Sequence, residues 1–250
     1  MCMKRLSIIA ALLAMAAPAF AQDGTPAEAP AAAEKVEVSS IRDPELLPYR
    51  RMVRGLDAWE EKRALAPKAD LRFELWTKDG KPAQTDGLQL RIAGDAVSIA
   101  LPLDADGTFV LPRSQEAFDD KADLVSNRKK AEIRWRPRVR TPGVPENARR
   151  LGDLRLECEV SVAVRKEEIP LLYRAGAAAA GGLCRLPMTG YIYRAPKRLA
   201  SATVVSGERK ARLSLLGNGE GYHAPLRDKS WGDEALVVYE FAEPPVPPAP

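Results

Sequence analysis

The sequence has 250 residues, and its formal net charge is +4 at pH 7. That length is enough for one large β domain or two small ones. The small net charge gives no reason to expect a nucleic-acid partner, and only the N-terminus carries a long apolar run.

The first 21 residues have the pattern of a signal peptide. Lys4 and Arg5 precede an apolar run at residues 8–17, and Ala-Phe-Ala at 19–21 has the form of a cleavage site. The run is shorter than the roughly 20 residues needed to span a bilayer. We therefore expect cleavage before Gln22, no transmembrane segment and a periplasmic protein, with secretion as the alternative. Losing two basic residues and no acidic ones lowers the net charge from +4 to +2.

Two segments precede the β region. Residues 22–42 are rich in Ala, Pro and Glu, which predicts a disordered linker. Residues 43–66 predict a helix, because Asp43 and Pro44 suit an N-cap and a first turn. Its apolar residues recur at helical spacing, at Leu46, Tyr49, Val53, Leu56 and Trp59. We expect this amphipathic helix to pack on the β domain, since packing supplies most of a helix's stability. The alternative is an arm that grips a ligand.

Residues 67–150 predict a first antiparallel β-sandwich. Apolar residues alternate with polar ones in short runs, and Gly/Asp turns separate the runs, which is typical of a sandwich or barrel. We expect strands near residues 71–75, 88–92, 97–103, 109–111 and 131–141. Residues 119–128 are expected to form a polar loop.

Part of this region resembles a known family. Gly-Lys-Pro at 80–82 is followed by an alternating strand, then by Asp-Ala-Asp-Gly at 104–107, Phe109 and Leu111. This order of turns is similar to that of the carboxypeptidase regulatory-like (prealbumin-like) β-sandwich domain, over residues 79–112. The resemblance implies a non-catalytic module, and the family supplies no catalytic residue to transfer.

Residues 151–242 predict a second sandwich or a continuation of the first. The clearest strand covers residues 154–164, where every even position is apolar or cysteine. Residues 166–179 suit a short helix or a flexible loop, and strands are expected again near 191–193 and 202–205. Similar residues recur 113 positions apart in the sequence, which favours a duplication into two sandwiches. One extended β domain is the alternative. Residues 243–250 form a proline-rich tail.

The cysteines predict a disulfide. Cys2 is removed with the signal peptide, so Cys158 and Cys184 are the pair that the mature chain retains. Two cysteines in an exported protein favour a bond between them. Cys158 should be buried, because it shares a face with valines and leucines. Two buried free thiols are the alternative.

The motifs of common catalytic and metal sites are missing. The sequence has a single histidine, His223, and neither G-x-S-x-G, H-E-x-x-H nor C-x-x-C occurs. On a strand His223 would point away from its neighbour Tyr222 and toward solvent. We therefore expect no metal site, no cofactor and no catalytic triad.

A row of arginines is the clearest binding feature. Arg134, Arg136, Arg138 and Arg140 occupy alternate positions beside Trp135. On a strand they would share one face, and guanidinium groups bind phosphates and carboxylates in bidentate fashion. A polyanion such as a lipid head group would suit this face. In the alternative, Glu157 and Glu159 on the next predicted strand neutralise the row through cross-strand ion pairs.

These observations favour an exported, non-catalytic β-sandwich protein that binds or scaffolds an envelope protein or glycan in the bacterial cell envelope. One alternative is a glycan-acting enzyme that uses two carboxylates among Asp119, Asp120, Asp228 and Asp233. The other is a polyanion binder that uses the arginine row.

Overall fold

The computed structural model describes residues 43–130, 132–179, 181–186 and 191–243. The expected signal peptide, the linker at 22–42 and the tail from residue 244 onward lie outside the described residues. The described chain is rich in β structure and contains four antiparallel sheets. None of its helices is both long and apolar enough to cross a membrane.

Two sheets surround the first core, which includes Tyr49, Met52, Phe73, Ile92 and Leu124. One has the order β1-β6-β3-β4, with strands Pro44–Pro48, Asp123–Lys129, Leu90–Ala93 and Ser98–Ala100. The other has the order β5-β2-β7, with strands Thr108–Phe109, Asp70–Thr77 and Ile133–Arg140. The strands expected between residues 71 and 141 are therefore confirmed, although β4 and β5 are shorter than expected.

The polar loop expected at residues 119–128 is wrong. Helix α2 (Gln115–Asp119) ends there, and β6 begins at Asp123. Strand β6 buries Leu124 and Ser126, while Val125 between them remains partly exposed. One buried leucine and one buried serine give too weak an alternation to reveal a strand in the sequence.

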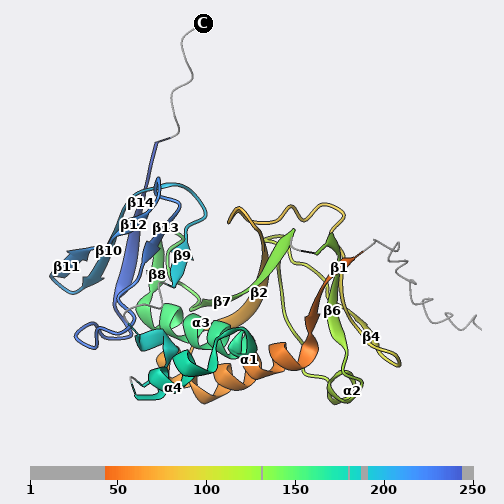
Figure 1. Cartoon of the computed structure of the whole chain (residues 1–250). Coiled ribbons are helices and arrows are strands. Elements are labelled where there is room, and N and C mark those ends of the chain that lie inside the picture. Colours follow the sequence, from red (N-terminus) through yellow and green to blue (C-terminus); the bar gives the residue numbers. More distant parts are fainter. Residues whose placement is uncertain (1–42, 131, 180, 187–190, 244–250) are drawn as a thin grey trace, which may run out of the picture. The chain divides into compact units, whose positions relative to one another are not determined.

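Helix α1 (Tyr49–Glu61) begins later than the sequence suggests. Residues 44–48, expected as its first turns, form β1 and pair with β6. Proline disfavours the helical conformation in the residue before it, and Pro48 therefore keeps Leu47 extended. Gly55 lies where α1 meets helix α3 (Leu151–Val164); a Cβ there would be 2.6 Å from Val164 Cγ2. The missing side chain lets the two helices run side by side (Figure 1).

Helix α3 corrects the clearest strand prediction, because residues 154–164 are helical. Leu156 and Val160 face the first core, whereas Leu151 and Leu154 face a second core. A helix that is buried on several sides has no single apolar stripe. Its apolar residues occupied even positions, which resembled the period of a strand.

The second core includes Tyr193, Val204, Tyr222, Trp231 and Tyr239. One of its sheets has the order β11-β10-β14-β8, with strands Arg209–Arg212, Leu199–Ser206, Leu236–Phe241 and Ala148–Arg150. The other has the order β12-β13-β9, with strands Leu215–Leu216, Gly221–His223 and Ile192–Arg194. In β13 Tyr222 is buried and His223 is exposed, as the sequence predicts.

The disulfide between Cys158 and Cys184 is confirmed, and both residues are buried. It joins α3 to the short 3-10 helix η3 (Leu183–Arg185), and two similar turns occur as η1 (Arg63–Leu65) and η2 (Lys166–Glu168). The bond encloses α4 (Leu171–Ala179), so the helix alternative for this segment is correct. Leu171 and Leu172 of α4 are 71% and 82% exposed. Because α4 buries little apolar surface, the disulfide is its main anchor.

Replacing both Cys158 and Cys184 by alanine should lower the free energy of unfolding by about 3 kcal/mol, from the loop-closure entropy of a bond across a sequence separation of 26. Urea unfolding of the variant and of the parent protein measures this loss. The variant should also be cut faster by trypsin after Arg174 in α4. An unchanged midpoint and an unchanged rate of cleavage would show that packing alone holds this segment.

Candidate binding cleft

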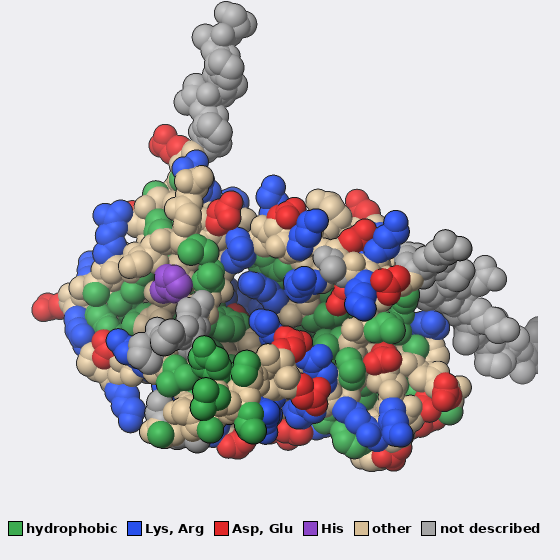
Figure 2. Space-filling view, in the orientation of Figure 1, with side chains coloured by type: hydrophobic (Ala, Val, Ile, Leu, Met, Phe, Trp, Pro, Cys, Tyr) green, Lys and Arg blue, Asp and Glu red, His purple; other side chains and the backbone are tan. Residues whose placement is uncertain are grey.

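A cleft of about 740 Å³ opens beside strand β7. Its walls come from six elements or their flanks: β1, α1, β7, α3, η2 and the start of β9. Figure 2 shows a hollow near the centre of the face in view, with basic side chains at its wall. Four arginines and two glutamates line this cleft, together with Trp135 and Tyr191.

Two of the four arginines are neutralised within the cleft. Arg51 comes from α1 and Arg165 directly follows α3, and both form ion pairs with Glu168. Arg51 also pairs with Glu167, at 3.9 Å, so two carboxylates balance the two guanidinium groups. Arg51 also donates to the carbonyl oxygen of Val164, at 3.2 Å. These contacts fix the guanidinium groups to the protein, so they add little free positive charge to the cleft.

Arg134 and Arg136 of β7 lack such a partner. Arg134 donates to the carbonyl oxygen of its neighbour Ile133 at 3.1 Å, and the Arg136 guanidinium lies 5.2 Å from the centre of the Trp76 ring. Within the part of the chain that the structure describes, neither arginine has a carboxylate in ion-pair distance. The positive charge of the cleft therefore resides on these two side chains.

The arginine row of the sequence divides between two places. Arg134, Trp135 and Arg136 line the cleft, whereas Arg138 and Arg140 line a smaller cavity of about 280 Å³. Arg138 pairs with Asp106 at 2.6 Å, and Arg140 donates to two backbone carbonyl oxygens. Arg138 and Arg140, which lie outside the cleft, thus stabilise neighbouring turns of the chain.

The expected neutralisation by Glu157 and Glu159 is wrong, because both residues belong to a helix. Glu157 pairs with Arg149 at 2.7 Å and accepts the backbone N–H of Val139 at 3.1 Å. It therefore faces the edge of β7 and not its arginine face. Glu159 lines a different cavity, on the side of α3 that carries the disulfide.

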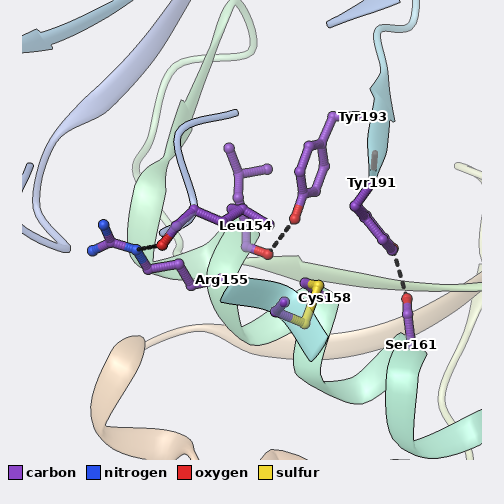
Figure 3. Close-up of a disulfide and its surroundings, with 8 residues drawn as sticks. Leu154, Arg155, Cys158, Ser161, Tyr191 and Tyr193 are labelled. Carbon is purple, nitrogen blue, oxygen red and sulfur yellow. Dashed lines mark hydrogen bonds between the residues drawn. A yellow bond between two sulfur atoms is a disulfide. The ribbon is translucent and has the colours of Figure 1, made fainter. Parts of the chain in front are cut away.

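The aromatic side chains of the cleft are held in place. Tyr191, just before β9, shares a hydrogen bond with Ser161 of α3 at 2.6 Å (Figure 3). Burial raises the pKa of Tyr191, so its hydroxyl stays protonated and able to donate. The ring of Trp135 meets Phe109 edge-on, 5.9 Å between centres, and its buried indole N–H has no partner among the described residues.

The four aspartates proposed for catalysis each have a structural contact. Asp119 accepts from Gln115, and Asp120 accepts the backbone N–H groups of Ala96 and Val97. Asp228 accepts from Ser230, and Asp233 pairs with Arg155 at 2.5 Å. Asp119 and Asp120 lie at the end of α2, whereas the other two precede β14. Within the described ranges, no three His, Cys, Asp or Glu side chains are grouped as a metal site would need.

Sequence reasoning missed Arg51, Ser161 and Tyr191 as parts of the cleft. They come from α1, α3 and the segment before β9, and more than 25 positions separate each from the next. No local pattern unites them. The one signal in the sequence was Ser161, which is a polar residue between apolar neighbours. In the structure Ser161 is largely buried.

Comparison of the chain with family models, with curated proteins and with solved structures finds no match. The resemblance of residues 79–112 to the carboxypeptidase regulatory-like domain therefore remains a prediction from turn chemistry. The function has to be argued from the cleft itself.

Glu74 gives a test of the electrostatics beside the cleft. It lies opposite Arg136 in the β2–β7 pair, and it accepts from the indole N–H of Trp76 at 2.5 Å. Burial raises its pKa above the ordinary value of 4.5. The folded protein thus holds this proton more tightly than the unfolded chain does. Glu74 therefore favours folding most below pH 4.5, and this contribution is lost as the pH rises through the folded-state pKa.

We expect Glu74→Gln to gain stability relative to the parent protein between pH 4 and pH 7. The glutamine oxygen can still accept from Trp76, and the buried charge is gone. Urea unfolding at both pH values measures the change, and Glu146→Gln, at an exposed residue, is the control. A relative stability of the Glu74 variant that falls toward pH 7 would contradict this account.

Proposed function

We propose that this protein is an exported, non-catalytic binding module of the bacterial cell envelope, and that the cleft beside β7 binds an anionic group of its partner. The observation that carries the proposal is the pair Arg134 and Arg136, which line a cleft without carboxylate partners in the described chain. Arg136 is half-buried, and a half-buried cation without a partner is costly, so the cleft favours an anionic ligand. Arg134 is exposed and adds a second positive charge at the rim of the same cleft.

The periplasmic location and the sandwich architecture are parts of the same proposal. The N-terminal sequence pattern and the bond between Cys158 and Cys184 favour an oxidising compartment. Two antiparallel sheets share the first core, which supports a sandwich-like arrangement. The presence of a second core with its own two sheets is compatible with a duplication. The family resemblance at residues 79–112 supports a binding role and not a catalytic one.

The carboxylate enzyme is retained as a second candidate because of one cavity of about 280 Å³ beside the disulfide. Glu159 and Asp233 both line it. Burial raises the pKa of Glu159, which would suit a general acid, while Asp233 is ion-paired with Arg155. Hydrolysis of a glycan that is lost in Glu159→Gln would favour the enzyme over the binding module.

The binding proposal is tested with inorganic polyphosphate as an anionic probe. The parent protein should bind it in a salt-dependent manner, and the double variant Arg134→Gln/Arg136→Gln should bind about tenfold more weakly or worse, since it loses two charge-assisted contacts. Isothermal titration calorimetry at two salt concentrations measures both effects.

Two control variants locate the effect. Arg138→Gln changes the same strand and the same face, but its guanidinium is already paired with Asp106. Arg212→Gln changes an exposed arginine of β11. Both should bind polyphosphate within about twofold of the parent protein if each loses only a screened surface charge. Equal losses in all three variants would show that net charge, and not the cleft, attracts the anion.

A further inference from the structure

Strand β7 is an edge strand whose open side is only partly covered. It lies at the end of the order β5-β2-β7, so one row of its backbone groups has no strand partner. Helix α3 and the strand before it supply side chains to part of that row. Asp153 accepts the N–H of Thr141 at 2.7 Å, Glu157 accepts that of Val139, and Arg149 donates to the carbonyl oxygen of Val139 at 2.9 Å.

The cover stops at Pro137. Backbone groups point to the same edge at every second residue, so the groups of Trp135 point to the edge where Val139 and Thr141 meet α3. Pro137 has no N–H to satisfy. The backbone N–H and carbonyl of Trp135 have no hydrogen-bond partner in the described parts of the chain, and both Trp135 and Pro137 line the cleft. The cleft therefore contains a short piece of strand edge whose backbone groups are unpaired at Trp135.

The side chains around this edge alternate in character. Arg134 and Arg136 project to one face of β7, and Trp135 projects to the other, where Phe109 lies. In an added antiparallel strand, the residue opposite Trp135 would exchange two hydrogen bonds with it. Its two neighbours would lie opposite Arg134 and Arg136 and on the same face as these arginines. The complementary sequence is therefore acidic, apolar, acidic.

We propose that the cleft binds an extended acidic peptide segment, which adds as a short antiparallel strand to the open edge of β7 at Trp135. This inference rests on the proposed anion-binding function and specifies its ligand. Main-chain hydrogen bonds to Trp135 would supply affinity, as in other cases of strand addition, and the two arginines would supply the preference for acidic residues at alternate positions. The covering carboxylates of Asp153 and Glu157 end the accessible edge, so the bound segment is short.

Three synthetic peptides separate the contributions of charge and backbone. The first is acetyl-Thr-Glu-Val-Glu-Thr-amide. In the second, both glutamates are replaced by glutamine. In the third, an ester oxygen replaces the N–H of the central valine, which removes one donor and keeps both charges. Titration of the ¹⁵N-labelled protein, followed by NMR, gives each dissociation constant and reports the amide exchange of Trp135 directly.

We expect the first peptide to bind about tenfold more tightly than either of the others, because each lacks hydrogen bonds that the edge or the arginines would make. Saturation with it should slow exchange of the Trp135 amide hydrogen at least about tenfold, whereas polyphosphate should not. Arg134→Gln/Arg136→Gln should weaken the first peptide and leave the glutamine peptide unchanged, and Arg212→Gln should affect neither.

The outcomes distinguish the two proposals. Equal binding of the ester and amide peptides, or unchanged exchange at Trp135, would overturn strand addition while leaving the anionic cleft in place. The same conclusion follows if polyphosphate binds through the two arginines and the first peptide does not bind. If the double arginine variant changes the binding of neither polyphosphate nor peptide, the anion-binding function fails as well.

Discussion

The open edge of strand β7 is the constraint on which the rest of the structure depends. Backbone groups that are buried without partners are costly, so an edge strand inside a fold needs partners from elsewhere. Helix α3 provides them with the carboxylates of Asp153 and Glu157, and Asp153 is fully buried. Because these contacts fix α3 along β7, they also place its apolar residues between the first core and the second. The cleft begins where this cover ends.

Helix α3 also explains why the sequence predicted the sheets better than the helix beside them. The strands between residues 71 and 111 have one buried face, so apolar and polar residues alternate and the pattern is informative. Residues 151–164 are buried on several sides, and their buried polar members, Asp153, Glu157 and Ser161, bind backbone or side-chain partners inside the protein. A helix of this kind carries neither an apolar stripe nor a polar one. The helical period of about 3.6 residues was therefore not visible in the order of its apolar and polar residues.

Only part of the candidate site could be predicted from the sequence. Arg134, Trp135 and Arg136 are neighbours in the sequence, and their alternation was sufficient to indicate a basic strand. The division of the row was not predictable, because it depends on Asp106 reaching Arg138 from a turn 32 positions away. Arg51 and Tyr191 complete the cleft from other elements, and contacts between distant elements are set by the tertiary fold. The disulfide was predictable because the expected removal of Cys2 with a signal peptide left Cys158 and Cys184 as one intramolecular pairing.

Strand β11 is also an edge strand, but its open edge is protected by basic side chains and not by carboxylates. It is the outer strand of its sheet, its four residues are all exposed, and three of them, Arg209, Lys210 and Arg212, are basic. Two copies of the protein that approached through this edge would bring like charges together, which opposes edge-to-edge pairing and the aggregation that follows from it. Charge thus opposes the approach of a second copy to the edge of β11, whereas carboxylates limit access to the edge of β7 to a few residues. If the edge of β7 binds a peptide as proposed, resistance to aggregation and selective recognition are assigned to different sheets.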